Sequence, residues 1–205
     1  MGMIIHRIEK YHTINAIKRH NGRHNEHTVR VCDSNLTDAI LRKKYNARKN
    51  AVLAIEGLYT ASPDAIAQMD DETLNSFFED CIAWHKKQYP GPIISIDIHF
   101  DESTGHMHIL SVPLINEKLN ARQIIGNRKD MADRQSDIAD TIGVKYGLAR
   151  GVKHSKAKHL PLMEREEALQ LIHDLQEQYK VTDEMLKQLQ DKQEQQKGID
   201  YNDIQ

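Results

Sequence analysis

Hydrophobic and polar positions alternate most regularly just before residue 100. From Ile94 to His99, isoleucine alternates with polar residues, which is typical of a strand with one buried face. After turn-forming residues at 101–105, the segment 106–113 has the same character and places His106 and His108 on one face. We therefore expect two neighbouring strands joined by a short connection, with His99 on the polar face of the first.

Other segments predict a mixture of strands and helices. Residues 3–8 and 51–60 read as two further strands. Helical character extends from Thr13 to about His27, and a second helix is expected from a cap at Asn35 or Thr37 to about Asn50. Three more helices are expected. The first begins at Ser62-Pro63-Asp64, and the second runs from a cap at Asp70 to just before Pro90. The third spans Asp130 to Tyr146 and ends at Gly147.

The end of the chain has a different pattern. From Ala168 to Leu189, apolar residues recur at alternating spacings of four and three, which predicts a helix with a heptad-like seam. We expect a catalytic domain over residues 1–160 and a C-terminal helical extension over 161–205. The seam allows two outcomes, docking onto the parent domain or forming a homodimer.

Length and cysteine content limit the class of protein. A chain of 205 residues is long enough for one sizeable core. Cys32 and Cys81 each lack a CxxC partner, and no apolar run approaches the roughly 20 residues of a membrane span. Because nothing at the N-terminus resembles a signal peptide either, we expect a cytoplasmic protein with no membrane role.

Charge is segregated along the chain, although the formal net charge is only -2. Basic residues gather in the segments 17–49 and 145–159, and acidic residues outnumber them from residue 160 onward. Two basic segments would attract a polyanion such as DNA. The residues expected to contact DNA are Lys18, Arg19, Arg23, Lys43, Lys44, Arg150, Lys153, Lys156 and Lys158.

The segment 99–108 concentrates metal-binding chemistry, with three imidazoles and two carboxylates in ten residues. If its two flanking strands form a hairpin, His99, His106 and His108 converge on one point. Neutral imidazoles suit divalent transition metals and leave coordination positions open for substrate oxygens. Mn²⁺ is the favoured ion and Mg²⁺, which prefers oxygen ligands, is the alternative.

The same segment, His-Phe-Asp-Glu-Ser-Thr-Gly-His-Met-His, resembles the metal motif of the Mob/Pre plasmid mobilisation and recombination proteins, the MobV group of relaxases. That family usually has proline at the position of Gly105. Residues 16–21 look like its first motif, and residues 150–159 look like the basic block after its last core helix. Between Asn21 and Ala51, the family's Asn-Tyr-Glu-Leu segment is not recognisable.

The resemblance implies an α+β fold, an HUH-endonuclease-like antiparallel sheet flanked by helices. It also implies metal-dependent nicking and rejoining of one DNA strand at a plasmid origin of transfer, through a covalent intermediate. The three histidines would be the metal ligands, Glu102 would orient the nucleophile, and His20 matches the nucleophile position. Tyr11 and Tyr45 lie close to the basic N-terminal segment and remain alternative nucleophiles.

Three other functions fit part of the pattern. A rolling-circle replication initiator or a transposase-type HUH nuclease would use similar metal chemistry. A DNA-binding repressor of the same fold would not need the metal. A metal-dependent hydrolase of small molecules is the third, and the basic segments weigh against it.

Overall fold

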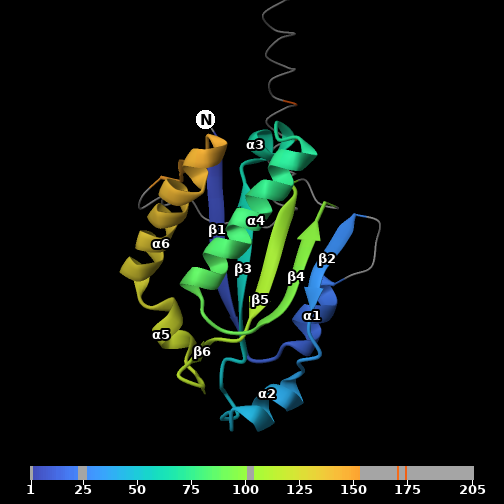
Figure 1. Cartoon of the computed structure of the whole chain (residues 1–205), viewed down its shortest axis with the longest axis vertical. Helices are drawn as coiled ribbons and strands as arrows, with labels where there is room; N and C mark the ends of the chain where they lie inside the picture. Colours follow the sequence, from blue (N-terminus) through green and yellow to red (C-terminus); the bar gives the residue numbers. More distant parts are fainter. Residues whose placement is uncertain (1, 23–26, 101–103, 153–169, 171–173, 175–205) are drawn as a thin grey trace, which may run out of the picture. The chain divides into compact units, whose positions relative to one another are not determined.

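A six-stranded sheet forms the centre of the protein (Figure 1). The computed structural model describes residues 2–22, 27–100, 104–152, 170 and 174. The strand order is β2-β4-β5-β3-β1-β8, and only β8 runs parallel to its neighbour, β1. The strands are β1 (Met3–Tyr11), β2 (Thr28–Asp33), β3 (Ala54–Ala61), β4 (Ile93–His99), β5 (His106–Ser111) and β8 (Ala149–Arg150). A hairpin of β6 (Leu114–Ile115) and β7 (Lys118–Leu119) follows β5.

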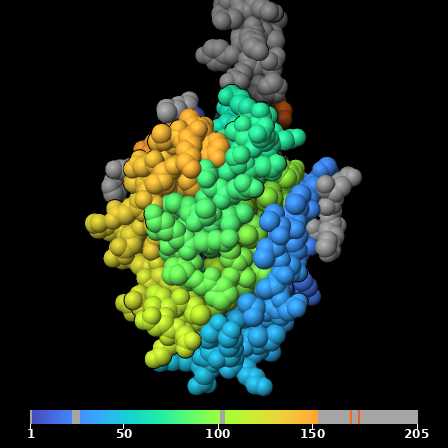
Figure 2. Space-filling model, viewed as in Figure 1, coloured from blue at the N-terminus to red at the C-terminus, as the bar shows by residue number. Residues whose placement is uncertain are grey.

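Helices cover one face of this sheet. Figure 1 shows α4 (Asp71–Gln88) in front of the strands and α6 (Arg128–Thr141) beside it, and Figure 2 shows their side chains closing this face. The short helices α3 (Pro63–Ala67) and α5 (Ala121–Ile125) precede them. Apolar side chains of β3, β4 and β5 pack against the helices and form the main core, which includes Ile55, Ile96, Met107, Ile109, Phe77, Phe78 and Trp84.

Alternation along the strands sends their polar residues to the opposite face. There, helices α1 (Asn15–Asn21) and α2 (Asp38–Lys44) accompany a second, smaller apolar cluster that includes Ile14, Leu41 and Leu110. The rest of this face carries polar and charged side chains of β1, β3, β4 and β5. It is therefore the face on which the predicted site lies.

Several local predictions are confirmed. The side chain of Asp70 accepts a hydrogen bond of 2.8 Å from the Thr73 amide and begins α4, and Thr37 caps α2 in the same way. The strands expected on either side of residues 101–105 are β4 and β5, which pair as an antiparallel hairpin.

The helix predicted from Thr13 to about His27 is shorter than expected. Helix α1 ends at Asn21, and the edge strand β2 follows it, where no strand was expected. The apolar positions of β2 mislead because Val29 and Val31 face outward and are 50% and 53% exposed. Between them, the side chain of Arg30 points to the sheet and bonds Asp97 of β4, with which β2 pairs. Hydrophobicity therefore gave no sign of a buried face here.

Two helix ends also differ from the prediction. Helix α2 stops at Lys44 rather than near Asn50, because Asn46 adopts a left-handed conformation with a φ of 45°. Helix α6 ends at Thr141, and residues Gly143–Tyr146 form a 3-10 turn that closes at Gly147, with a φ of 65°.

The predicted C-terminal helix lies outside the described residues, apart from Gln170 and Asp174. Residues Met1–Lys153 and His154–Gln205 form separate units, and the site belongs to the first. Among the described helices, none is long and apolar enough to cross a membrane.

Candidate metal centre

Three histidines meet on the polar face of the sheet. His99 ends β4, and His106, opposite it, begins β5 with His108 two residues further on. One ligand atom from each imidazole lies within 4.8 Å of the others. His99 and His106 are buried, and His108 is partly exposed. The hairpin thus brings together the three residues that the sequence predicted, as the phase of the two strands required.

Hydrogen bonds to oxygen atoms orient each imidazole. His99 donates from Nε2 to the carbonyl oxygen of Asn21 at 2.7 Å, and His106 donates from Nδ1 to that of Thr104 at 2.9 Å. The Nδ1 of His108 lies 3.1 Å from Oε1 of Glu56. Because these oxygens can only accept, each bond fixes which ring nitrogen carries the proton. In a neutral ring, the second nitrogen then has the lone pair that a metal requires.

Glu56 was not predicted from the sequence. It lies in β3, beside β5, and its side chain bonds His108, the amide of Asn21 and the hydroxyl of Tyr11. Burial alone would raise the pKa of this carboxyl, but the hydrogen bonds outweigh it and hold the pKa below its usual value. Glu56 is therefore an anion beside the histidines, and the donor set fits a divalent metal.

His20 lies next to this cluster. It is an exposed residue in the last turn of α1, and it lines a pocket of about 230 Å³ together with Tyr11, Glu56 and His108. The structure thus places the predicted nucleophile and one predicted metal ligand on the same small cavity. Glu102, the expected orienting residue, lies outside the described residues.

The two alternative nucleophiles have different surroundings. The hydroxyl of Tyr11 donates to Glu9 and Glu56, and burial together with the negative charge of Glu56 raises the pKa of this phenol. Tyr45 directly follows the last residue of α2 and packs against the smaller apolar cluster. Helix α2 lies at the end of the sheet opposite to the point where β4 reaches His99 (Figure 1).

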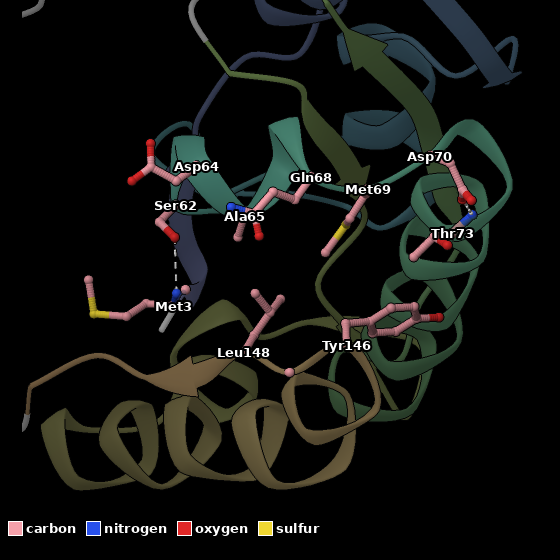
Figure 3. Close-up of a pocket in the computed structure, with 12 residues that line it drawn as sticks. Met3, Ser62, Asp64, Ala65, Gln68, Met69, Asp70, Thr73, Tyr146 and Leu148 are labelled. Carbon is pink, nitrogen blue, oxygen red and sulfur yellow. Dashed lines mark hydrogen bonds between the residues drawn. The ribbon is translucent and has the colours of Figure 1, made fainter.

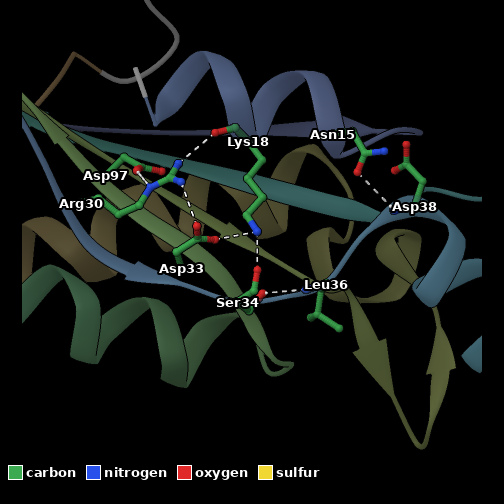
Figure 4. Close-up of polar contacts among 8 residues, drawn as sticks. All are labelled: Asn15, Lys18, Arg30, Asp33, Ser34, Leu36, Asp38 and Asp97. Carbon is green, nitrogen blue, oxygen red and sulfur yellow. Dashed lines mark hydrogen bonds and ion pairs between the residues drawn. The ribbon is translucent and has the colours of Figure 1, made fainter. Parts of the chain in front are cut away.

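A group of ion pairs fastens α1 to the strand that ends in His99. Arg30 of β2 donates to Asp97 at 2.6 Å, to Asp33 at 3.0 Å and to the carbonyl oxygen of Lys18 at 2.9 Å (Figure 4). Lys18 itself pairs with Asp33 at 2.6 Å and donates to the carbonyl of Ser34. These bonds link the helix that carries His20 to β2 and β4.

The basic residues predicted to contact DNA are in different situations. Lys18 is engaged with Asp33, whereas Arg19, Lys43 and Lys44 are exposed on α1 and α2. Arg150 bonds the side chain of Ser136 and two backbone carbonyls. The other four, Arg23, Lys153, Lys156 and Lys158, lie outside the described residues.

A larger pocket, of about 760 Å³, lies elsewhere (Figure 3). Residues of α3 and the start of α4 line it together with Met3, Tyr146 and Leu148. Met3 donates its amide to Ser62 on this wall at 3.1 Å. No histidine is among its lining residues, so this pocket is separate from the candidate metal centre.

The fold and the site define a class. A mostly antiparallel sheet with helices on both faces carries three histidines on two adjacent strands, as in HUH-type nuclease domains. Residues 31–167 match the model of the plasmid recombination enzyme family, and the chain belongs to that family. The match begins after α1, so it includes the three histidines but not His20.

Individual relatives agree with this assignment. A plasmid recombination enzyme of Streptococcus agalactiae is 32% identical over 137 residues, which are 64% of this chain and 28% of that protein. A type 1 enzyme of Staphylococcus aureus is 27% identical over 146 residues, 70% of this chain and 35% of that protein. The chain therefore spans about a third of the length of these relatives.

Among solved structures, the relaxase domain of MobM is similar to this chain. In a Mn-bound crystal structure it is in complex with DNA of the plasmid pMV158 origin of transfer. The likeness has a TM-score of 0.69 and 25% identity, and covers 81% of this chain and 98% of that domain. The α+β sheet flanked by helices that the sequence predicted is thus confirmed.

Proposed function

We propose that this chain nicks one strand of DNA at a plasmid origin of transfer and rejoins it through a covalent protein–DNA intermediate. The observation that carries the proposal is the convergence of His99, His106 and His108 beside a pocket that His20 also lines. Family membership and the DNA-bound relaxase of the same fold support it.

In this proposal His20 is the nucleophile. A neutral imidazole nitrogen of His20 attacks the scissile phosphorus, a phosphorus–nitrogen bond forms, and the bond to the 3′-oxygen breaks. The departing oxygen takes a proton and leaves as a 3′-hydroxyl, while the other ring nitrogen of His20 gives its proton to a base, the role that the family resemblance gives to Glu102. Attack by that hydroxyl on the phosphoramidate reverses these steps and reseals the strand.

His99, His106 and His108 would hold the metal in this reaction. A bound divalent ion would polarise the scissile phosphate and stabilise the charge that develops on its oxygens. Glu56 keeps the ring of His108 oriented, and the carbonyl of Asn21 does the same for His99. We propose Mn²⁺ as the physiological ion, with Mg²⁺ as the alternative, since nitrogen ligands suit Mn²⁺ better.

The proposed partner is origin-of-transfer DNA, in single-stranded form or in a supercoiled plasmid. A homodimer through residues 161–205 stays a prediction, which the mass of the protein in solution would test. We place the reaction in the cytoplasm, where plasmid DNA is found.

The test is incubation with supercoiled plasmids that carry candidate origins, with Mn²⁺ or with EDTA, followed by protease treatment and mapping of the DNA ends. The expected result is a metal-dependent nick with peptide attached to the 5′ end. The His106→Ala/His108→Ala variant should bind little metal and form no nick. Full metal binding by this folded variant would contradict the assigned site, and equal activity in EDTA would contradict the proposed reaction.

A further inference from the structure

A second pocket outside the metal centre is lined by basic residues. It has a volume of about 540 Å³ and lies between the segment that follows α2 and the residues of β7 and α5. Arg48, Lys118 and Arg122 line it, and none of its lining residues is acidic. We propose that this basic pocket binds the phosphate backbone of the DNA substrate, several nucleotides from the nick; the proposal rests on the proposed function.

The positive charges of this pocket are not neutralised by the described part of the protein. Arg48, Lys118 and Arg122 are exposed, and none of the three has an ion pair among the described residues. The amides of Asn46 and Asn50 add neutral hydrogen-bond donors to the lining. Unpaired cations beside amide donors suit phosphate oxygens, which accept hydrogen bonds and carry negative charge.

The loop that carries Arg48 is held in place before any ligand binds. Arg42 donates to the carbonyl oxygens of Arg48 and Lys49, at 3.1 and 3.2 Å, and to that of His12 at 2.9 Å. The Ala51 amide also closes a turn onto the carbonyl of Arg48 at 3.0 Å. Because these bonds fix the backbone, the pocket would lose little conformational entropy when a phosphate binds.

The basic pocket lies close enough to the pocket of His20 for one DNA strand to span the distance. Val52 lines the basic pocket, and Glu56, four residues further along the chain, lines the pocket of His20. At a maximum of about 3.3–3.6 Å per residue, the Cα atoms of Val52 and Glu56 are at most roughly 14 Å apart. One strand advances about 3.4 Å per nucleotide in a duplex and further when it is single-stranded, so at most about four nucleotides cover this distance.

The test compares two lengths of origin DNA, a short one that ends near the nick and a long one that extends beyond it on either side. The variant Arg48→Gln/Lys118→Gln/Arg122→Gln should bind the long DNA more weakly and the short DNA as the original protein does. Log affinity falls with log salt, and the loss of three contacts to single-stranded DNA should make this slope less steep by about 2. The affinity of the original protein for the long DNA, divided by that of the variant, should then fall about 20-fold from 50 to 200 mM salt.

A matched variant removes three exposed lysines from the helix-covered side, Lys86→Gln/Lys129→Gln/Lys145→Gln, and should leave both affinities and the slope almost unchanged. Unfolding temperatures of both variants confirm that they are folded. An unchanged slope on the long DNA, or an equal loss on both DNAs, would overturn the proposal for the basic pocket. If the original protein neither binds nor nicks either DNA, the proposed function itself fails.

Discussion

Each histidine of the proposed metal site bonds an oxygen atom of another residue, and Glu56 is the one of these three acceptors that is a side chain. Glu56→Gln keeps the size of the side chain but removes the charge that faces Nδ1 of His108. Loss of such a supporting carboxylate typically weakens metal binding 10- to 100-fold. We expect a loss of this size in a Mn²⁺ titration followed by calorimetry.

Glu9→Gln is the control for this change, because Glu9 also bonds Tyr11 but has no hydrogen bond to a histidine among the described contacts. It should bind Mn²⁺ as the original protein does. If Glu56→Gln binds with unchanged affinity, the carboxylate does not support the metal site.

A second residue-scale prediction separates His20 from Tyr11 as the nucleophile. His20→Ala should form no covalent adduct, since it lacks the attacking nitrogen, while Tyr11→Phe should keep forming one. Burial and the two carboxylates that the Tyr11 hydroxyl bonds raise the pKa of this phenol, so Tyr11 is a poor source of phenolate. Mass spectrometry of the protease-treated adduct gives the attachment site.

Acid treatment provides an independent check on the same prediction. A phosphoramidate through imidazole is labile to acid, whereas a phosphotyrosine ester survives mild acid. An acid-stable adduct that maps to Tyr11 or Tyr45 would transfer the role to that tyrosine and leave the proposed nicking reaction in place.

At the scale of elements, the attachment of α1 to the sheet depends on Arg30. Its bond to Asp97 neutralises a carboxylate that is fully buried, and the same guanidinium holds the end of α1. Arg30→Met should therefore lower the free energy of unfolding by about 3–5 kcal/mol, because it leaves the charge of Asp97 buried without a partner. Urea denaturation measures this difference.

Two further variants test whether the unpaired charge of Asp97 causes this loss of stability. Arg30→Met/Asp97→Asn removes both charges and should recover much of the lost stability. Lys129→Met breaks the exposed pair with Asp133 and should change the free energy of unfolding by less than about 1 kcal/mol. If Arg30→Met is no more destabilising than Lys129→Met, Arg30 does not stabilise the protein by compensating the buried charge of Asp97.

At the scale of the whole molecule, two buried histidines make stability depend on pH. His6 and His85 lie in the main core, where His85 bonds the hydroxyl groups of Tyr59 and Ser111 at 2.7 and 3.0 Å. Burial lowers the pKa of each histidine from 6.5 to about 3. Both therefore stay neutral in the folded protein, while in the unfolded chain they take up protons below about pH 6.5.

The unfolded state thus binds more protons, and stability should fall as the pH drops from about 6.5 towards 3. At 1.36 kcal/mol per pKa unit, the difference between 6.5 and about 3 means that each histidine contributes at most about 5 kcal/mol to this loss. Urea denaturation between pH 7 and pH 4, with a chelator present, measures it. In His85→Gln, the free energy of unfolding should fall less steeply as the pH drops. An equally steep fall would mean that His85 does not contribute to the pH dependence of stability.

The sequence by itself determined those parts of the site that depend on local geometry. Alternation in residues 94–99 and 106–113 set the phase of two strands, and their short connection made them neighbours. His99, His106 and His108 then had to converge. The cap at Asp70 was equally predictable, and Thr37 was one of the two caps expected for α2, because a capping side chain bonds an amide within its own helix.

Only the tertiary structure decided which distant residues complete the site. Glu56 reaches His108 because β3 pairs with β5, and Asn21 reaches His99 because α1 packs over the polar face. The pairs are separated by 52 and 78 residues, and no local pattern encodes which strands become neighbours across such distances. The edge strand β2 was not predicted for a related reason. Its side chains contribute the ion pairs of Arg30, and it has no buried apolar face that a hydrophobic pattern would reveal.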